Sequence, residues 1–316
     1  MKKIICLLLA LVLVLSMAAC SAAEQTDTTE AEDSSVTTEA EPTETADSEE
    51  DTGETEEDEA SEAVQLQFVL GTPLTNEVEY YTDDSSVVLL SEKYELPQLT
   101  LCTADGAACD LEAEAEGENA GMVEICNVFN ARMQETAEEL DAAAAEDLET
   151  ARAQYEGLSE DDRANWANYA EELTLASTYQ TSGLVSVMAE SYVNLGGAHP
   201  SSNIRTWNFD LTTGEFLTFE SIAENDANGE ELVSSLTAAI LNQIQTEGLS
   251  ENYNSNYEEA VNNLAENANF YFDENGMTVT FDADVLAPYA VGAQSFTFSF
   301  DQFRDQLSDH LRSLLN

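Results

Sequence analysis

Cysteine thiols are the first side chains in this sequence whose chemistry depends on spacing. Cys102 and Cys109 flank the dipeptide Asp105-Gly106, which is typical of a two-residue hairpin turn. Counting outward from that turn places the two cysteines directly opposite each other, at a Cα separation that a disulfide can bridge. In an oxidising compartment the spacing therefore predicts a Cys102–Cys109 disulfide and leaves Cys126 as the odd thiol.

A histidine in a glycine-rich turn is the second candidate. His199 follows Gly196 and Gly197, and Tyr192 lies on the strand that leads into the turn. Loops held by rigid sheets commonly carry ligand-contacting residues, so these four residues form a candidate ligand loop. The alternative is that the glycines satisfy special backbone angles and that His199 makes a local structural hydrogen bond.

Other candidates for catalysis or metal binding are weaker. We interpret His310 as structural, because a histidine near the end of the last helix favours the helix dipole. The sequence has no Gly-x-Ser-x-Gly turn for a serine nucleophile, and segments 224–226 and 273–275 lack the ligand spacing of an EF-hand. Three thiols without a matching histidine disfavour zinc. We therefore expect no catalytic residue, metal or cofactor.

The first twenty residues predict export. Lys2 and Lys3 precede an apolar run over 4–17, which is too short for a stable span and suits a cleavable signal peptide over 1–20. The end of this run, Met-Ala-Ala-Cys, resembles a lipobox, in which the thiol of Cys20 would take the lipid. We expect a lipid-anchored chain at the outer face of a bacterial cytoplasmic membrane. The alternative is an ordinary secretory signal in which Cys20 is incidental.

Charge divides the remainder into a tether and a folded region. Residues 21–63 hold 18 acidic residues and no Lys or Arg, which predicts an extended, disordered tether. Residues 64–316 hold 46 acidic and 7 basic residues, a formal net charge of −39. Such a charge disfavours binding to nucleic acid or to anionic lipid and is compatible with a basic partner. Adaptation of a whole proteome to its habitat would explain the same acidity.

Hydrophobic periodicity predicts an α+β fold, in which antiparallel hairpins pack with helices. A helical hairpin insertion is expected over 124–177, broken at 157–162 and restarted by Ser159 as the N-cap. Strands are expected at 64–71, 184–195, 205–211, 216–219, 270–272, 277–281 and 296–300. Helices are expected around Leu232, Leu236, Ile240 and Ile244, and through Phe303, Leu307, Leu311 and Leu314. The predicted boundaries are an N-terminal subdomain over 64–180 and a C-terminal domain over 181–316.

Three ordered segments resemble a known family. They are YVNLGGAHP at 192–200, WNFDLTTGE at 207–215 and LAPYAVG at 286–292. Together they resemble the extracellular module of two paired domains of unknown function, DUF4163 followed by DUF3298. That module occurs in lysozyme-sensing anti-sigma factors and in some peptidoglycan deacetylases, and 180–316 matches it best. We expect no counterpart here of the sigma-binding segment, the membrane span or the metal-dependent catalytic domain of those relatives.

The resemblance implies a ligand class. In the sensor relatives the module binds lysozyme, a basic protein, which would suit an acidic partner. We therefore expect a non-enzymatic, lipid-anchored binding module for a wall-associated ligand, either a lysozyme-like protein or peptidoglycan. Two alternatives stay open, namely a cell-wall-active hydrolase that uses His199 and a structural subunit of an envelope complex.

Overall fold

The computed structural model describes residues 65–223, 230–248 and 250–315. All of them belong to one compact unit, Ser61–Asn316. The strands are β1 (Leu66–Leu70), β2 (Leu74–Tyr81), β3 (Val88–Leu96), β4 (Leu99–Thr103), β5 (Tyr169–Gln180), β6 (Leu184–Asn194), β7 (Ser201–Asp210), β8 (Glu215–Phe216), β9 (Ala268–Asp273), β10 (Gly276–Phe281) and β11 (Gln294–Phe298). The α-helices are α1 (Leu111–Glu114), α2 (Ala120–Gly157), α3 (Glu160–Arg163), α4 (Glu230–Thr246), α5 (Tyr257–Asn262), α6 (Leu264–Asn267), α7 (Phe300–Phe303) and α8 (Asp309–Leu314).

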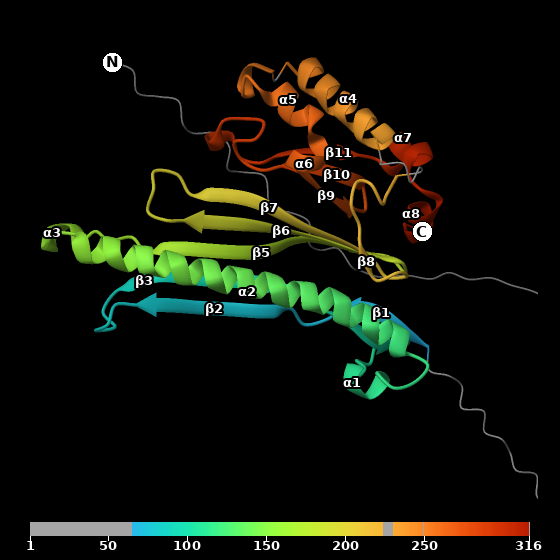
Figure 1. The fold of residues 1–316 in the computed structure, drawn as a ribbon, viewed down its shortest axis with the longest axis horizontal. Coiled ribbons are helices and arrows are strands. Elements are labelled where there is room, and N and C mark those ends of the chain that lie inside the picture. Colours follow the sequence, from blue (N-terminus) through green and yellow to red (C-terminus); the bar gives the residue numbers. More distant parts are fainter. Residues whose placement is uncertain (1–64, 224–229, 249, 316) are drawn as a thin grey trace, which may run out of the picture. The chain divides into compact units, whose positions relative to one another are not determined.

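The largest sheet has six strands in the order β2-β3-β5-β6-β7-β8. Its pairs are antiparallel except β3 with β5, which run parallel. Parallel neighbours need a long crossover connection, and α2 supplies most of it, as Figure 1 shows. The 38-residue helix lies along the sheet and follows β3 and β5 closely.

Helix α2 packs on the sheet through two kinds of residue. Its N-terminal half inserts larger side chains, including Phe129 and Met133, into a core that also contains Phe209 of β7. Its C-terminal half presents Ala144 and Ala151, which pack against Leu90 and the neighbouring strands. Small residues let helix and sheet approach closely, and the larger Leu148 and Tyr155 of this half pack against the same cluster while partly buried.

Strands β1 and β4 form a separate two-stranded antiparallel sheet. The Asn130 side chain of α2 binds the backbone of β4 at both ends of its amide. Its Oδ1 accepts from Leu99 N at 2.8 Å, and its Nδ2 donates to Leu99 O at 2.9 Å. One side-chain amide thereby satisfies the backbone N–H and C=O of Leu99 and fixes the position of α2 relative to β4.

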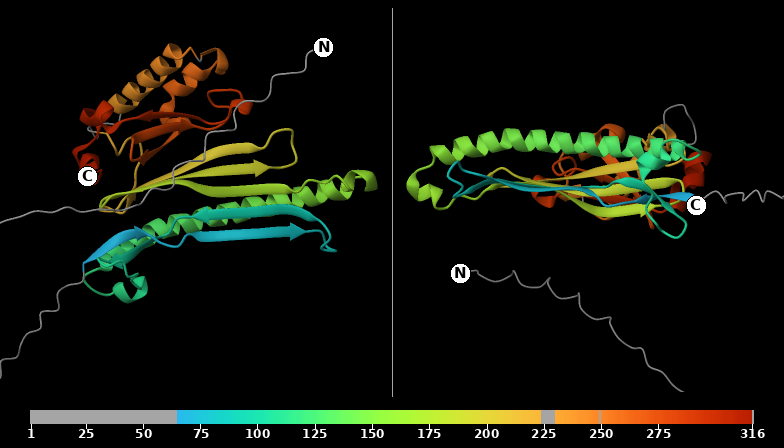
Figure 2. Two further views of the ribbon diagram at one scale, coloured as in Figure 1. Left: turned by 180° about the vertical axis from the view of Figure 1, so that it is seen from behind. Right: turned by 90° about the horizontal axis from the view of Figure 1, so that it is seen from below.

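The C-terminal region is built on a three-stranded antiparallel sheet in the order β11-β10-β9, with the short helices and α4 around it (Figures 1 and 2). The predicted apolar face of α4 is confirmed, because Leu232, Leu236, Ile240 and Ile244 are all buried in this core. The predicted strands at 270–272 and 277–281 are also confirmed, and they pair as an antiparallel hairpin with Asp273 opposite Gly276.

The edge of this smaller sheet meets polar side chains of the larger one. Phe272 N donates to Ser186 Oγ at 2.8 Å, and Asn208 Nδ2 donates to Phe270 O at 2.7 Å. Ser186 and Asn208 bond each other at 2.7 Å. An edge strand exposes unpaired backbone groups, and here two buried side chains satisfy them. Since Phe209 packs on Phe129 of α2, its neighbour Asn208 points to the opposite face of the sheet.

The α+β class is confirmed, but the helical hairpin predicted over 124–177 is wrong. The helical hairpin is one long helix followed by the single turn α3, which Ser159 caps by accepting from Asp162 N at 3.3 Å. The segment 169–180 then forms strand β5 in place of a second helix.

The predicted C-terminal helix is interrupted. Helix α7 ends at Phe303, and α8 begins after Ser308, whose hydroxyl caps it by accepting from Leu311 N. Strands β5 and β6 are neighbours in one sheet although the predicted boundary at 180/181 separates them. Among the helices of the described residues, none combines the length and the apolar character needed to cross a bilayer.

Candidate functional site

The hairpin that carries Cys102 and Cys109 has a register different from the predicted one. Thr103 N donates to Ala107 O, and Gly106 has a φ of 85°, so the loop contains three residues with a glycine in the left-handed region. The extra residue shifts the pairing by one, and Cys102 lies opposite Ala108. The predicted disulfide is therefore wrong in this structure, where both of these cysteines and the buried Cys126 are free thiols.

Two of the segments that resemble the known family meet in space. His199, at the exposed tip between β6 and β7, has its ring centroid 6.1 Å from that of Tyr289, which lies between β10 and β11. Each loop also carries an exposed apolar side chain, Leu195 at 39% and Val291 at 53% of full exposure. We call residues 195–200 and 286–292 together the two-loop surface.

The predicted loop glycines have distinct roles. Gly196 has a φ of +74°, and a Cβ there would lie 3.1 Å from the ring of Tyr169. Asn194 Oδ1 accepts from Gly196 N at 3.1 Å and so closes the turn. Gly196 is thus required by backbone conformation and close packing, as the structural alternative predicted. Gly197 is exposed, and a Cβ there would have space.

Tyr192 belongs to a different surface. It pairs with Glu172 of β5, which pairs with Lys93 of β3, which pairs in turn with Glu77 of β2. These residues share the sheet face opposite α2, and all except the half-buried Tyr192 are exposed. We call this row the open sheet face. Glu190, exposed on the same face, adds another carboxylate.

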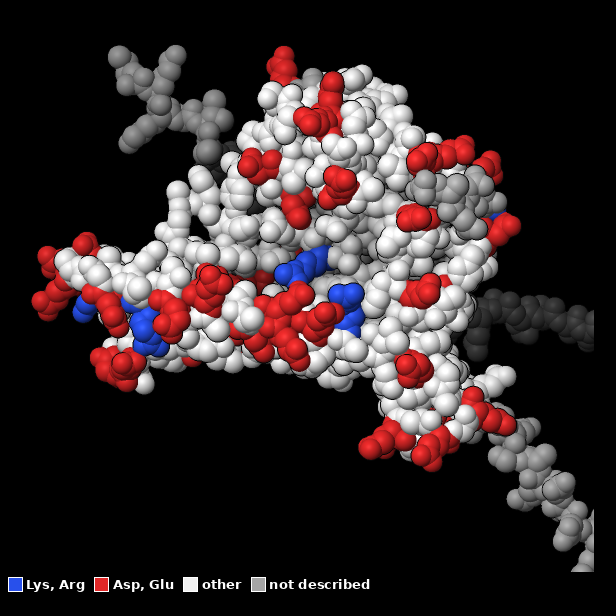
Figure 3. All heavy atoms as spheres, viewed as in Figure 1, with Lys and Arg blue, Asp and Glu red and all other residues white. Residues whose placement is uncertain are grey.

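The described surface carries many carboxylates and few cations, as Figure 3 shows for one side. Most cations already have partners within the chain. These pairs are Arg132 with Glu135, Arg152 with Asp83, Arg163 with the carbonyls of Tyr155 and Glu156, Arg205 with Glu139, Arg304 with Asp301, and Arg312 with Asp309. The acidic surplus of 64–316 is therefore left largely without neutralisation by the chain's own side chains.

His310 binds Asp210 rather than a helix C-terminus. It lies in the first turn of α8, and its Nε2 is 2.5 Å from Asp210 Oδ2. The other oxygen of Asp210 accepts from Thr212 N and from the Thr212 hydroxyl, each at 2.7 Å. Burial opposes ionisation of Asp210, but the bonds to His310 and Thr212 outweigh it and hold its pKa below the usual value. The predicted dipole role is wrong, and the pair ties α8 to the end of β7.

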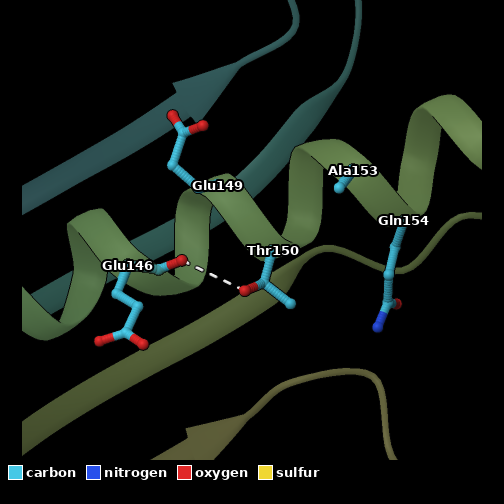
Figure 4. Close-up of a pocket in the computed structure, with 5 residues that line it drawn as sticks. All are labelled: Glu146, Glu149, Thr150, Ala153 and Gln154. Carbon is cyan, nitrogen blue, oxygen red and sulfur yellow. Dashed lines mark hydrogen bonds between the residues drawn. The ribbon is translucent and has the colours of Figure 1, made fainter.

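A shallow depression on α2 offers little for chemistry. Figure 4 shows that its five lining side chains all come from this helix, with Glu146 and Gln154 pointing to one side and Glu149 to the other. The Thr150 hydroxyl donates a hydrogen bond to the backbone carbonyl of Glu146 at 3.3 Å. No group of three or more His, Cys, Asp or Glu residues in the described ranges is arranged to hold a metal ion.

Sequence reasoning missed a pair of buried glutamates beneath α2. Glu92 of β3 and Glu171 of β5 are directly paired, and they are 2% and 7% exposed. Burial raises the pKa of Glu92, and burial together with the charge of Asp147 raises the pKa of Glu171 to about 7. The only sequence signal was a glutamate at a position of β5 where alternation calls for an apolar residue.

Comparisons with known proteins support the C-terminal part of the resemblance. Residues 224–301 match the model of the family described as "Protein of unknown function (DUF3298)". A solved structure of a DUF3298 family member from Bacteroides fragilis NCTC 9343 has a TM-score of 0.52 and 15% identity, over 80% of this chain and 98% of that one. A second member, from Pseudomonas aeruginosa PAO1, has a TM-score of 0.42 and 15% identity, over 78% and 96%. Comparison with curated proteins gave no significant match.

These comparisons leave several predictions where they stood. The Bacteroides structure shows a shared fold over most of the described residues, and its family carries no stated function. The DUF4163 half of the resemblance and the two domain boundaries stay predictions. Cys20, the signal peptide over 1–20 and the tether over 21–63 lie outside the described residues.

Proposed function

We propose that this chain is a lipid-anchored, extracytoplasmic binding module that is not an enzyme, and that its ligand is a wall-associated basic protein of the lysozyme kind. One observation carries the proposal, namely the acidic surplus of 64–316 that the chain's own cations leave unpaired. A surface of one sign attracts a partner of the other sign and accelerates its association. The resemblance to lysozyme-sensing modules agrees with this choice.

The two-loop surface is the contact region that we favour. It joins two loops far apart in the sequence, exposes Leu195 and Val291, and places His199 beside Tyr289. Interfaces commonly have an apolar and aromatic centre inside a polar rim, and the exposed Asp284, two residues before the second loop, would belong to that rim.

A binding measurement tests the ligand class. Residues 61–316, which form one compact unit, should bind immobilised lysozyme reversibly and saturably, with an association rate that falls about tenfold or more as salt rises. Lysozyme with acetylated lysines is the matched control, because it keeps the fold and loses positive charge; it should bind far more weakly. Saturable binding to isolated peptidoglycan alone would favour the second ligand. Binding to neither would overturn the proposal.

Paired variants test the contact region. Val291→Ser should weaken binding, because Val291 lies on the two-loop surface and is 53% exposed. Val128→Ser, at an exposed position of α2, is the control that should leave binding unchanged. Equal effects of the two substitutions would move the contact away from the two loops.

The anchor and the absence of catalysis have their own tests. The protein should fractionate with membranes and incorporate labelled fatty acid, and Cys20→Ser should abolish both. Incubation with muropeptides should release no product; product release that disappears in His199→Ala would establish the hydrolase alternative. Crosslinking in cells that returned one fixed membrane partner would favour the structural subunit.

A further inference from the structure

Two carboxyl groups are buried side by side beneath α2. Glu92 and Glu171 are register partners of the parallel strands β3 and β5, so both side chains leave the same face of the sheet. That face is the one covered by α2, and Glu92 and Glu171 are only 2% and 7% exposed. Buried acidic residues are rare unless a partner compensates them.

The bonding of the pair is incomplete. Tyr80 donates its hydroxyl to Glu92 Oε2 at 2.8 Å. Oε1 of Glu92 and Oε1 of Glu171 are buried, and neither has a hydrogen-bond partner in the described part of the chain. Both residues border a cavity of about 20 Å³ that Leu140 and Ser191 also line. An ionised oxygen without a partner is costly in such a place, whereas a proton on it removes the charge.

The groups around the pair do not supply positive charge. Asp141 and Asp147 face it from α2, and the hydroxyls of Tyr80 and Tyr94 face it from β2 and β3. Asp141 acts on Glu92, while Asp147 and Glu92 act on Glu171, and each of these influences opposes ionisation. The pair and the two aspartates of α2 therefore resist holding four negative charges at once.

We propose that Glu92 and Glu171 form a proton-binding site that fastens the middle of α2 to the six-stranded sheet. When the pair holds a proton, the carboxyl groups lose their mutual repulsion and can donate toward Asp141 or Asp147. When the pair is fully ionised, like charges on β3, β5 and α2 push the helix from the sheet. In this stretch α2 buries only Ala144 and Ala151 fully, while its larger Leu148 and Tyr155 pack there partly buried, so the contact that resists this push is limited. This device does not depend on the ligand of the module.

The direction of the pH dependence follows from the raised pKa values. A carboxyl that holds its proton more tightly in the folded state contributes stability below its unfolded pKa, near 4.5, and loses that contribution as pH rises through about 7. For Glu171 the displacement corresponds to a change of roughly two orders of magnitude in the folding equilibrium between acidic and alkaline pH.

A matched pair of substitutions on β5 separates this site from the general acidity of the molecule. Glu171→Gln keeps the shape and mimics the protonated form, whereas Glu172→Gln removes one exposed carboxylate from the opposite face. The wild-type melting temperature should fall as pH rises from about 5 to about 8, with an inflection near 7. Glu171→Gln should remove that inflection, and Glu172→Gln should keep it. Retention of the inflection in Glu171→Gln would overturn the proposal.

Two measurements on the unaltered protein keep the test independent of variant folding. The side-chain carboxyl carbon of Glu171 should titrate near pH 7 by NMR, and a midpoint near 4.5 would contradict the proposal. Amides of α2 between 137 and 151 should exchange faster at about pH 8 than at about pH 5.5 after correction for intrinsic rates. A midpoint that moved with added metal or ammonium ion would show a cation site in place of a proton site and would also overturn it.

Discussion

At the scale of single residues, Asp210 is the buried charge whose partners are fully accounted for. Its two oxygens bind His310 and the 212–213 turn, and its pKa lies below the usual value. Its ionised form therefore stabilises the fold above the unfolded pKa, near 3.8, and that contribution is lost as pH falls through the lower folded pKa. This direction is opposite to that of Glu171.

Asp210→Asn should lower the free energy of unfolding by about 1–3 kcal/mol at neutral pH. Both oxygens of Asp210 accept hydrogen bonds, and asparagine replaces one of them with an NH₂ group and removes the charge. The difference from wild type should shrink at acid pH. Urea denaturation at pH 7 and pH 3 measures both. Asp309→Asn, at a neighbouring carboxylate whose side chain is 90% exposed, should change stability by less than about 0.5 kcal/mol. A loss equal in the two variants would contradict the role of the Asp210–His310 bond.

Gly276 begins β10 at a place where a side chain has no room. Its φ is +151°, and a Cβ would lie 2.0 Å from Phe298 O of β11. Gly276→Ala should therefore cost more than about 2 kcal/mol, since the backbone of β11 would have to move. Gly121→Ala is the control, because nothing lies within 4 Å of its Cβ position in the first turn of α2. Thermal unfolding should show a large loss for the first and no loss for the second.

At the scale of elements, prediction from sequence succeeded where a periodic pattern was uninterrupted. The spacing of apolar residues predicted α4, and the alternation of apolar residues predicted β7 and β10. Strand β5 was mistaken for a helix because Glu171 fills a buried position and Ala170-Glu171-Glu172-Leu173 favours a helix. Glu171, which made the strand look helical, is also the residue whose pKa is raised to about 7. Sequence rules for secondary structure are expected to fail at such functional or strained positions.

Long-range arrangement was beyond the sequence patterns. The left-handed turn at Gly196 was predictable from residue type, but the meeting of His199 with Tyr289 depends on two loops 90 residues apart. The apolar spacing 303, 307, 311 and 314 survives in the structure although Ser308 divides the helix. Spacing alone could not reveal that break, because Phe303 of α7, Leu307 between the helices, and Leu311 and Leu314 of α8 are all buried in one core, as they would be on a continuous helix.

The close packing of α2 predicts which face of the helix tolerates a larger side chain. Ala144 is fully buried against the sheet, and its neighbour Ala143 is exposed. Ala144→Leu should cost about 1–3 kcal/mol through overpacking, whereas Ala143→Leu should be nearly neutral because leucine is a good helix former. Chemical denaturation compares the two. Equal effects would mean that the helix presents a different face to the sheet.

At the scale of the whole molecule, the acidic surplus should act against folding. Residues 64–316 carry a formal net charge of −39, and their cations are mostly engaged with single carboxylates. Like charges spread over one compact unit repel, and dissolved salt screens that repulsion over roughly 10 Å at about 0.1 M. Screening should therefore stabilise this protein more than a protein of balanced charge.

Raising sodium chloride from about 20 mM to about 500 mM at pH 8 should increase the melting temperature by about 5 °C. The same addition at pH 4.5 should have a smaller effect, because many carboxylates are then protonated. Glu171→Gln should keep this salt response at pH 8, since buried pairs are screened much less than exposed charges. Calorimetry at both pH values separates the two sources of pH dependence. An equal salt response at pH 4.5 and 8 would mean that the surface carboxylates do not strain the fold, and that the buried pair alone governs its stability near neutral pH.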